Sequence, residues 1–360
     1  MGDSARGPLA VYSARPTIQI DGQEDERVSE LLLSLRMQEQ EGGLSNLELA
    51  LSNWAAEPNG RSDFAFGAVS PLQLGAGITV HTGAVGAQHE IFRGSISALE
   101  LAASHVAPPQ FILQAEDALN RARMARHTKL HENVSIADVA RNIASDLGLT
   151  PVIGDLDPPT GIWAQINESD LAFLRRLLRR CDGDLQVVGT ELHVFPAGEF
   201  RRNEVEIGLY NQISSVRVVA DLAEQVTEVM ALGWDAAAGQ AINESWSTDP
   251  ATPGQGQSGA QALGRAQIER VERIGHLAFR DSAEAREVAR AAFEQRASRF
   301  VTLRATIEGN PQVRVGTHVR VSDLEPRFNN TYYVSQAIHR YDLIHGYQTE
   351  VTAHCPFLAN

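Results

Sequence analysis

The residues best suited to chemistry in this chain are its 11 histidines, because an imidazole can bind a metal ion or transfer a proton near neutral pH. His127 and His131 have the i, i+4 spacing of two ligands on one helical face. No carboxylate or third histidine stands at a recognisable interval from them, and the segment is not clearly helical. His339, His345 and His354 lie on or between predicted strands. We therefore expect surface histidines in the first pair, structural or interfacial histidines in the second group, and neither a metal ion nor a cofactor.

A glycine-rich segment from Ser247 to Gln261 is the next candidate site. A serine hydrolase needs a G-x-S-x-G turn between a strand and a helix, and a phosphate-binding loop needs a strand before its glycines and a helix directly after them. Gly254, Gly256 and Gly259 follow the second spacing, but no strand precedes them, and Ser258 lacks the hydrolase spacing. The Gly, Pro, Ser and Gln content favours an exposed, mobile loop. We expect no catalytic residue here.

Runs of charge form a third group of candidates. The acidic runs 24–26 and 39–41 could imitate paired catalytic carboxylates, but both lie beside predicted hairpin turns, so we expect solvated charge. Four arginines lie mostly on the outer side of a predicted helix, where they could bind an acidic surface of a partner or simply face solvent. These arginines are Arg175, Arg176, Arg179 and Arg180.

Composition limits the class of protein. A length of 360 residues allows several domains, and 43% apolar with 21% charged residues is typical of a folded chain. The formal net charge of −14 opposes a phosphate backbone, so we do not expect a nucleic-acid partner. Cys181 and Cys355 alone give neither a disulfide framework nor a metal knuckle, which favours folding in a reducing cytosol. Residues 1–11 lack a signal-peptide pattern, and no stretch is long and apolar enough for a membrane span.

The first third of the chain predicts β-structure. Leu31, Leu33, Leu35 and Met37 recur with period two, as one face of a long strand requires, and alternation resumes at 47–51 after a glycine pair. Further short alternations continue to about residue 117. Roughly six strands in about 100 residues indicate a small barrel or sandwich.

The rest of the chain predicts an α+β module and a second set of strands. Ser135 precedes an i, i+3, i+4 apolar stripe that stops at Gly148, and a second helix follows at about 169–181 with a hairpin after it. A third helix, capped by Asp281 or Ser282, ends near residue 300. Strand patterns then continue without a helix to about residue 353.

A weak internal repeat links the two sets of strands. Ile78 and Phe92 are 14 residues apart, as are Val319 and Tyr333, and in both places a strand lies on each side of a polar loop. A third strand follows in each copy. Chance similarity between two hairpins is the alternative explanation.

An ordered run of segments in the middle of the chain matches one known module. The segments are Ser135–Ala140, Gly148-Leu149, Asn167–Leu174, Gly183, Leu185, Val187 and Leu192–Val194. The run resembles the central module of phage late control D proteins, which also occurs in the hub half of VgrG spikes. More loosely, Phe92–Ile96 resembles the strand that closes the family's first barrel, and residues 316–321 and 333–351 resemble the second barrel.

The resemblance implies a mainly β fold with α+β insertions, built from two small antiparallel β-barrels of the tail-hub type and two smaller α+β modules. We expect a first barrel at 8–117, an α+β module at 118–202, a second barrel from 203–234 and 301–355, and a loop-rich insertion with one helix at 235–300. VgrG proteins continue into a spike, whereas this sequence ends at Asn360. We therefore expect the spike to be a separate protein.

The function that the resemblance implies is structural and non-enzymatic. Three copies, each with two equivalent barrels, would form a baseplate hub that joins a three-fold spike to a six-fold inner tube. Expected partners are a spike, inner tube or tube-initiator proteins and baseplate wedge proteins. The chain would be made in the bacterial cytoplasm and assembled into a phage tail or an extracellular contractile particle. Alternatives are a tail-associated hydrolase and a VgrG-like secretion spike carrier.

Eight residues are candidate contacts within such an assembly. They are Arg175, Arg176, Arg179, Arg180, Val319, Tyr333, Tyr347 and Phe357.

Overall fold

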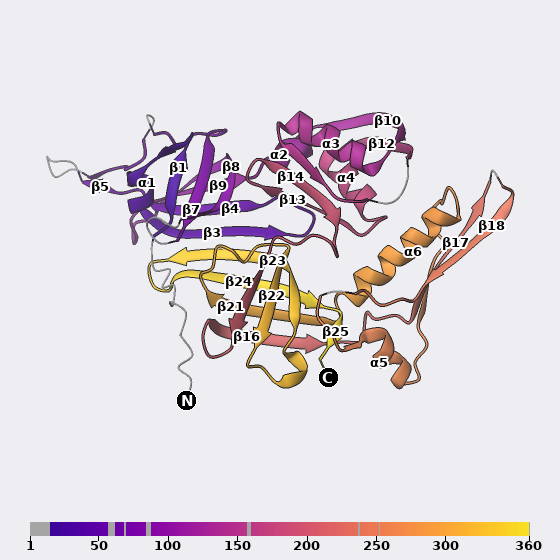
Figure 1. Ribbon diagram of the computed structural model, residues 1–360. Helices are drawn as coiled ribbons and strands as arrows, with labels where there is room; N and C mark the ends of the chain where they lie inside the picture. The colour runs from indigo at the N-terminus through magenta and orange to yellow at the C-terminus, as the bar shows by residue number, and fades with distance from the viewer. Residues whose placement is uncertain are drawn as a thin grey trace.

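The computed structural model describes residues 15–56, 62–67, 70–83, 88–156, 160–236, 238–251 and 253–359. These residues form a mainly β fold, as predicted, with one 13-stranded sheet and several smaller sheets. Figure 1 shows two β-rich halves in contact, an α+β module beside the first half, and an insertion that projects away from the second. The predicted start of the first barrel at residue 8 and the segment 1–11 lie outside the described residues.

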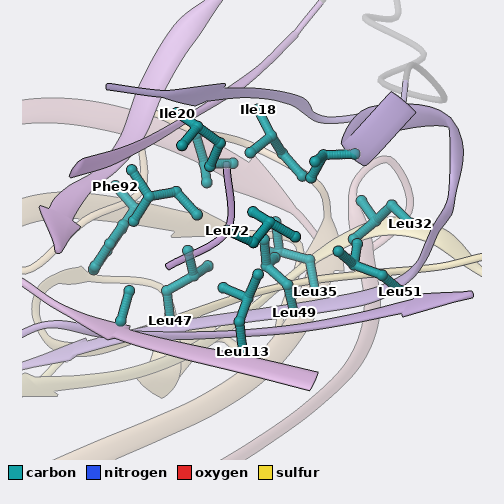
Figure 2. Close-up of a cluster of buried hydrophobic side chains, with 14 of the residues drawn as sticks. Ile18, Ile20, Leu32, Leu35, Leu47, Leu49, Leu51, Leu72, Phe92 and Leu113 are labelled. Carbon is teal, nitrogen blue, oxygen red and sulfur yellow. The ribbon is translucent and has the colours of Figure 1, made fainter. Parts of the chain in front are cut away.

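The first β-rich half has a core of aliphatic side chains that converge from its strands (Figure 2). Leu35, Met37 and the leucines of the next strand are buried, as the alternation predicts. Leu32 is buried in place of Leu31 and Leu33, because a bulge at this point shifts the phase of the strand. The elements of this half are β1 (Thr17–Ile20), β2 (Gln23–Glu24), α1 (Glu26–Glu30), β3 (Leu32–Gln40), β4 (Asn46–Ser52), β5 (Ala55–Ala56), β6 (Ser62–Asp63), β7 (Gly77–Thr82), β8 (His89–Ala102) and β9 (Gln110–Glu116).

The α+β module has a separate core in which two helices cover a small sheet. Ser135 and Asp138 form the predicted capping box, and Gly148 ends the first of these helices in the left-handed conformation, with φ 72°. Each fully buried leucine or phenylalanine here stabilises the fold by roughly 1.5 to 3 kcal/mol. The elements are α2 (Leu119–Met124), β10 (Arg126–Val134), α3 (Ile136–Leu147), β11 (Thr150–Ile153), β12 (Gly161–Ser169), α4 (Asp170–Leu178), β13 (Gly183–Val188) and β14 (Glu191–Pro196).

The second β-rich half closes the chain. Its inward residues, among them Val319 and Val321, form a third core. The elements are β15 (Asn203–Gly208), β16 (Ile213–Ala220), β21 (Val301–Glu308), β22 (Thr317–Ser322), η1 (Pro326–Phe328), β23 (Thr331–Asp342), β24 (Gly346–Cys355) and β25 (Phe357–Leu358). The pairing of strands shows large antiparallel sheets, while the closure of each half into a barrel stays a prediction.

The insertion contains more strands and helices than the sequence predicted. It contains β17 (Glu228–Asp235), β18 (Gln240–Trp246), β19 (Gln257–Ser258), α5 (Gly259–Arg265), β20 (Val271–Ile274) and α6 (Ser282–Ala297). β17 pairs with β18 and β20, and α6 packs on this sheet. β17 thus pairs within this smaller sheet and not with the strands of the second unit, because the pattern of a strand does not show which sheet it joins. The predicted domain bounds stay a prediction.

The glycine-rich segment is not an exposed loop in its second half. Ser258 is fully buried, pairs with β25 and accepts a hydrogen bond of 3.1 Å from the backbone N–H of Gln261. The Asn330 side chain bonds both the N–H and the carbonyl of Gln255, at 3.1 and 3.0 Å. The sequence contained no signal for these distant partners.

Candidate functional site

The two β-rich halves repeat one strand order, so the joint between them is the candidate functional site. Hydrogen-bonded neighbours run β1-β7-β8-β9-β4-β3 in the first half and β15-β22-β23-β24-β21-β16 in the second. Strands in corresponding places also follow the same chain order. One difference is that β15 is parallel to β22, whereas β1 is antiparallel to β7. We call these two six-stranded sets the first unit and the second unit.

The irregularities of the two units also correspond. A bulge at the start of β3, where it pairs with β4, has its counterpart at the start of β16, where it pairs with β21. A second bulge places Ser97 in β8 and Ser335 in β23. Both serine hydroxyls donate to a carbonyl of the next strand, at 3.3 Å to Gln114 and 3.2 Å to Thr352. Matching bulges with matching hydrogen bonds support a true structural repeat.

The repeat predicted from the sequence lies in the correct strands, but only one of its two pairs of corresponding residues is correct. Val319 corresponds to Ile78, because their partners, Tyr332 and Gly94, each lie three residues before the bulged serine of their own strand. Tyr333, however, corresponds to Ser95 and not to Phe92. Ile78 and Gly94 are 16 residues apart, whereas Val319 and Tyr332 are 13 apart, because β7 and β8 stay paired further along the hairpin. A count of equal spacings does not reveal this difference.

The joint consists of β3 from the first unit paired antiparallel with β23 from the second. Gln40 lies opposite Gln336 at one end, and Ser34 lies opposite Asp342 at the other. This pairing makes the sheets of the two units continuous (Figure 1). β3 is therefore paired on both sides, with β4 and with β23.

Glu39 lies inside this joint, so the expectation of solvated charge at 39–41 is wrong for this residue. Its side chain is 1% exposed and accepts hydrogen bonds from Arg314 at 2.6 Å, Arg202 at 3.1 Å and the Val315 N–H at 2.6 Å. Burial alone would raise the pKa of Glu39, but the two guanidinium groups hold it at about 2. The alternation could have revealed its burial, because Glu39 continues the inward phase of Met37.

A second polar contact in the joint involves His339. Its side chain is fully buried, with Nδ1 2.7 Å from the Tyr347 hydroxyl and 3.3 Å from the Thr349 hydroxyl. Burial lowers the pKa of His339 to about 3, and the positive charge of Arg314 acts in the same direction. His339 is therefore neutral near pH 7, and its contacts are those of a packed residue.

The hairpin turn after β3 docks the α+β module. The Arg175 side chain donates to the carbonyls of Gly42 and Gly43, at 2.6 and 3.0 Å, and the Gly42 N–H donates to Asp184 at 2.5 Å. Gly43 has φ 69°, and a Cβ atom there would lie 2.6 Å from the Leu119 side chain. This position therefore requires glycine both for its backbone conformation and for space.

A cavity of about 470 Å³ lies where this hairpin, the end of α4 and α6 meet. Its lining includes Glu41, Asp182, Asp184 and Tyr333. Burial raises the pKa of Glu41 to about 7, with the nearby Asp184 adding to the effect, and burial also raises the pKa of Asp182 to about 6. The cavity can therefore take up protons between neutral and mildly acidic pH.

The four arginines of α4 and its C-terminus do not form one patch. Arg175 holds the hairpin turn, Arg176 pairs with an acid of its own module, and Arg179 lines the cavity. Arg180 forms a largely buried pair of 2.6 Å with Glu284 of α6. Their binding to a partner's acidic surface stays a prediction, although Arg175 and Arg180 already have partners within the chain.

The other predicted contact residues lie mostly inside the chain. Val319 is 1% exposed, Tyr333 8% and Tyr347 5%, whereas Phe357 is half-buried. The side chains of Val319, Tyr333 and Tyr347 are therefore largely covered within this chain. Their role in an interface stays a prediction.

The remaining chemical candidates, His127 and His131, lie in the α+β module. Both lie on the strand β10, with His127 3.5 Å from Asp170. Within the described ranges, no group of three or more His, Cys, Asp or Glu side chains could hold a metal ion. No helix in those ranges is long and apolar enough to cross a membrane.

Comparison with known proteins gives one family and several related folds. Residues 14–342 match the family described as the Alg8 N-terminal domain. No curated protein sequence matches the chain at a significant level. The 43 kDa tail protein of prophage MuSo2 from Shewanella oneidensis is 11% identical with a TM-score of 0.67, over 95% of this chain and 98% of that one.

Two further solved structures share the fold. A tail protein from Neisseria meningitidis MC58 is 11% identical, with a TM-score of 0.65 over 94% of this chain and 96% of that one. An Escherichia coli component of the type VI secretion system is 11% identical, with a TM-score of 0.58 over 95% of this chain and 78% of that one. That protein is described as structurally similar to the bacteriophage T4 tail proteins gp27 and gp5. At this level of identity the likeness establishes the fold alone.

Proposed function

The chain belongs to the Alg8 N-terminal domain family, and we propose that it is a structural, non-enzymatic hub subunit of a contractile tail or injection particle. In this role three copies would surround the tail axis and join a three-fold spike to a six-fold inner tube. The similarity in fold to phage tail proteins and to a type VI secretion component supports the class of particle. The closer resemblance to late control D proteins remains part of the proposal.

The repeat of the two units is the observation that carries this function. A protein that mediates between three-fold and six-fold partners must present its contact surface twice per copy, since a closed ring of three identical subunits has only three-fold symmetry. The shared strand order, the matching bulges and the paired serine hydrogen bonds give each chain two equivalent units. A hydrolase has no need of such a repeat.

The proposed partners follow from this geometry. The spike would contact the three-fold side of the ring, and tube or tube-initiator proteins would contact the six repeated units. Baseplate wedge proteins would bind outside the ring. The insertion from β17 to α6 belongs to the second unit only, so it would distinguish three positions from the other three.

The test is the mass of the chain with and without its spike, followed by electron microscopy of assembled particles. We expect three copies of the chain on one spike, at the junction with the tube. A complex that contains a single copy would refute the proposal. The alternative of a secretion spike carrier, favoured by the fold of the type VI component, predicts instead that the chain leaves the particle with a secreted effector.

A further inference from the structure

Two of the unpaired strand edges in the part of the chain that the structure describes lie at related places in the two units. β16 pairs with β21 on one side and ends the long sheet on the other. In β8, residues 89–95 pair with β7, whereas residues 97–102 pair with β9 alone. These two edges lie on opposite sides of the joint (Figure 1).

The joint within the chain shows how such edges fit together. By the correspondence of the two units, β16 is the counterpart of β3, and residues 97–102 of β8 are the counterpart of the part of β23 that pairs with β3. The chain therefore contains one complete joint, β3 paired with β23, and both strands of a second joint, β16 and residues 97–102 of β8, which are not paired with each other. These two strands cannot meet within one copy without breaking the sheet between them.

The exposure of apolar side chains along these two edges supports their pairing with another chain. At the centre of the internal joint Met37 and His339 are both fully buried. Leu101, the counterpart of His339, is 54% exposed, and Val219, next to the counterpart of Met37, is 41% exposed. An exposed strand edge with apolar side chains favours pairing with another chain.

Charge supports the same pairing. Arg217 of β16 lies opposite Arg304 of β21, and both are exposed. Two like charges opposite each other destabilise a sheet. In the first unit the corresponding pair is Arg36 with Glu48, which has no such repulsion. Glu100 on the β8 edge would lie diagonally across from Arg217 and would offset the repulsion.

We propose that β16 of one copy pairs antiparallel with residues 97–102 of β8 in a second copy of this chain. The register follows the internal joint: Val218 lies opposite Leu101, as Met37 lies opposite His339, and Ala220 lies opposite Leu99. Each copy offers one edge of each kind, so the contact is head-to-tail and extends until a ring closes. That the ring closes at three copies rests on the proposed function, while the pairing of the edges does not.

Disulfide cross-linking tests the register. The chain with both Val218→Cys and Leu101→Cys, oxidised under mild conditions, should give covalent multimers on a non-reducing gel that end at three copies. The natural Cys181 and Cys355 are buried, so they should not contribute. The matched control is Arg217→Cys with Leu101→Cys. It should not cross-link, because a shift of one residue turns the side chain to the other face.

Blocked edges test the direction of the contact. Leu101→Lys alone and Val218→Lys alone should each lose the trimer mass while keeping the unfolding temperature of the parent chain. A mixture of these two variants should form a one-to-one dimer, because each supplies the edge that the other lacks. If Val218→Lys unfolds, Val219→Glu on the exposed face of the same strand replaces it, because it places a second carboxylate opposite Glu100 of the other copy.

Each outcome separates the edge pairing from the hub function. Cross-linked rings or filaments with another number of copies would uphold the pairing and refute the three-fold hub. A trimer that fails to cross-link in this register would refute the pairing and leave the hub function standing. Homodimers from Val218→Cys alone, which would require two β16 edges in contact, would also refute the pairing. A chain that stays monomeric without cross-links up to millimolar concentration would overturn it as well.

Discussion

Replacing Glu39 by glutamine removes the negative charge that holds two guanidinium groups inside the joint of the two units. Arg202 and Arg314 would remain largely buried, with side chains 12% and 15% exposed, and would face a neutral amide. Removal of one partner from a buried ion pair destabilises a protein by about 3 to 5 kcal/mol. We expect a loss of this size in the free energy of unfolding at pH 7.

The pH dependence of this loss follows from the depressed pKa of Glu39. The pKa is about 2 in the fold and 4.5 as the ordinary value, so ionised Glu39 contributes stability above pH 4.5 and loses it as the pH falls towards 2. The difference corresponds to about 3 kcal/mol at about 1.4 kcal/mol for each pH unit. The difference in free energy of unfolding between the parent chain and Glu39→Gln should therefore be smaller at pH 3 than at pH 7, by about 2 kcal/mol.

Urea unfolding of the two proteins from pH 7 to pH 3 measures both quantities. Because both proteins contain all the other acidic groups, those contributions cancel in the difference. Glu48→Gln on the neighbouring strand is the matched control, since Glu48 is exposed, and it should change stability by less than about 0.5 kcal/mol. A loss below about 1 kcal/mol at pH 7, or a difference that does not vary with pH, would refute the ion-pair argument.

Three further changes test other parts of the fold. Glu41→Gln should raise the free energy of unfolding at pH 8 but not at pH 4. The pKa of Glu41 is raised to about 7 in the fold, so the stability that its protonation provides is lost as the pH rises from 4.5 through 7. Urea midpoints at the two pH values check this. Val319→Asp should cost at least about 3 kcal/mol, since it buries an unpaired carboxylate, and electron microscopy should show particles without spikes or tubes. Tyr347→Phe should cost about 1 to 2 kcal/mol through the lost contact with His339, visible as a lower unfolding temperature.

Local patterns in the sequence predicted the three longest helices and most of the longer strands, because the signals for these elements lie within a few residues. The capping box at Ser135, the stop at Gly148 and the cap at Asp281 all depend on neighbours in sequence. The same patterns failed where a distant partner decides the structure. Asn330 fixes a segment about 75 residues earlier, which composition alone marks as a loop.

The site was harder to predict than the fold, because its residues have ordinary local surroundings. Glu39 looks like one of several acids beside a turn until Arg202 and Arg314, from far along the chain, are placed beside it. Arg175 looks like part of an outward stripe until the turn at Gly42 is docked against it. Both contacts are long-range, so one sequence gives no direct signal for them.

The repeat itself explains why so little of the function is visible in the residue types. The two units keep the same strand order and the same bulges with different side chains, so that Met37 corresponds to Val218 and His339 to Leu101. What is retained is the path of the backbone, and a strand edge binds mainly through backbone N–H and C=O groups, which every residue except proline can supply in full. A protein that assembles by its strand edges can therefore vary most of its side chains as long as each edge keeps its register. This is why the pairing of the edges, tested by cysteines at Val218 and Leu101, is a sharper probe of function in this chain than substitution of any single polar residue.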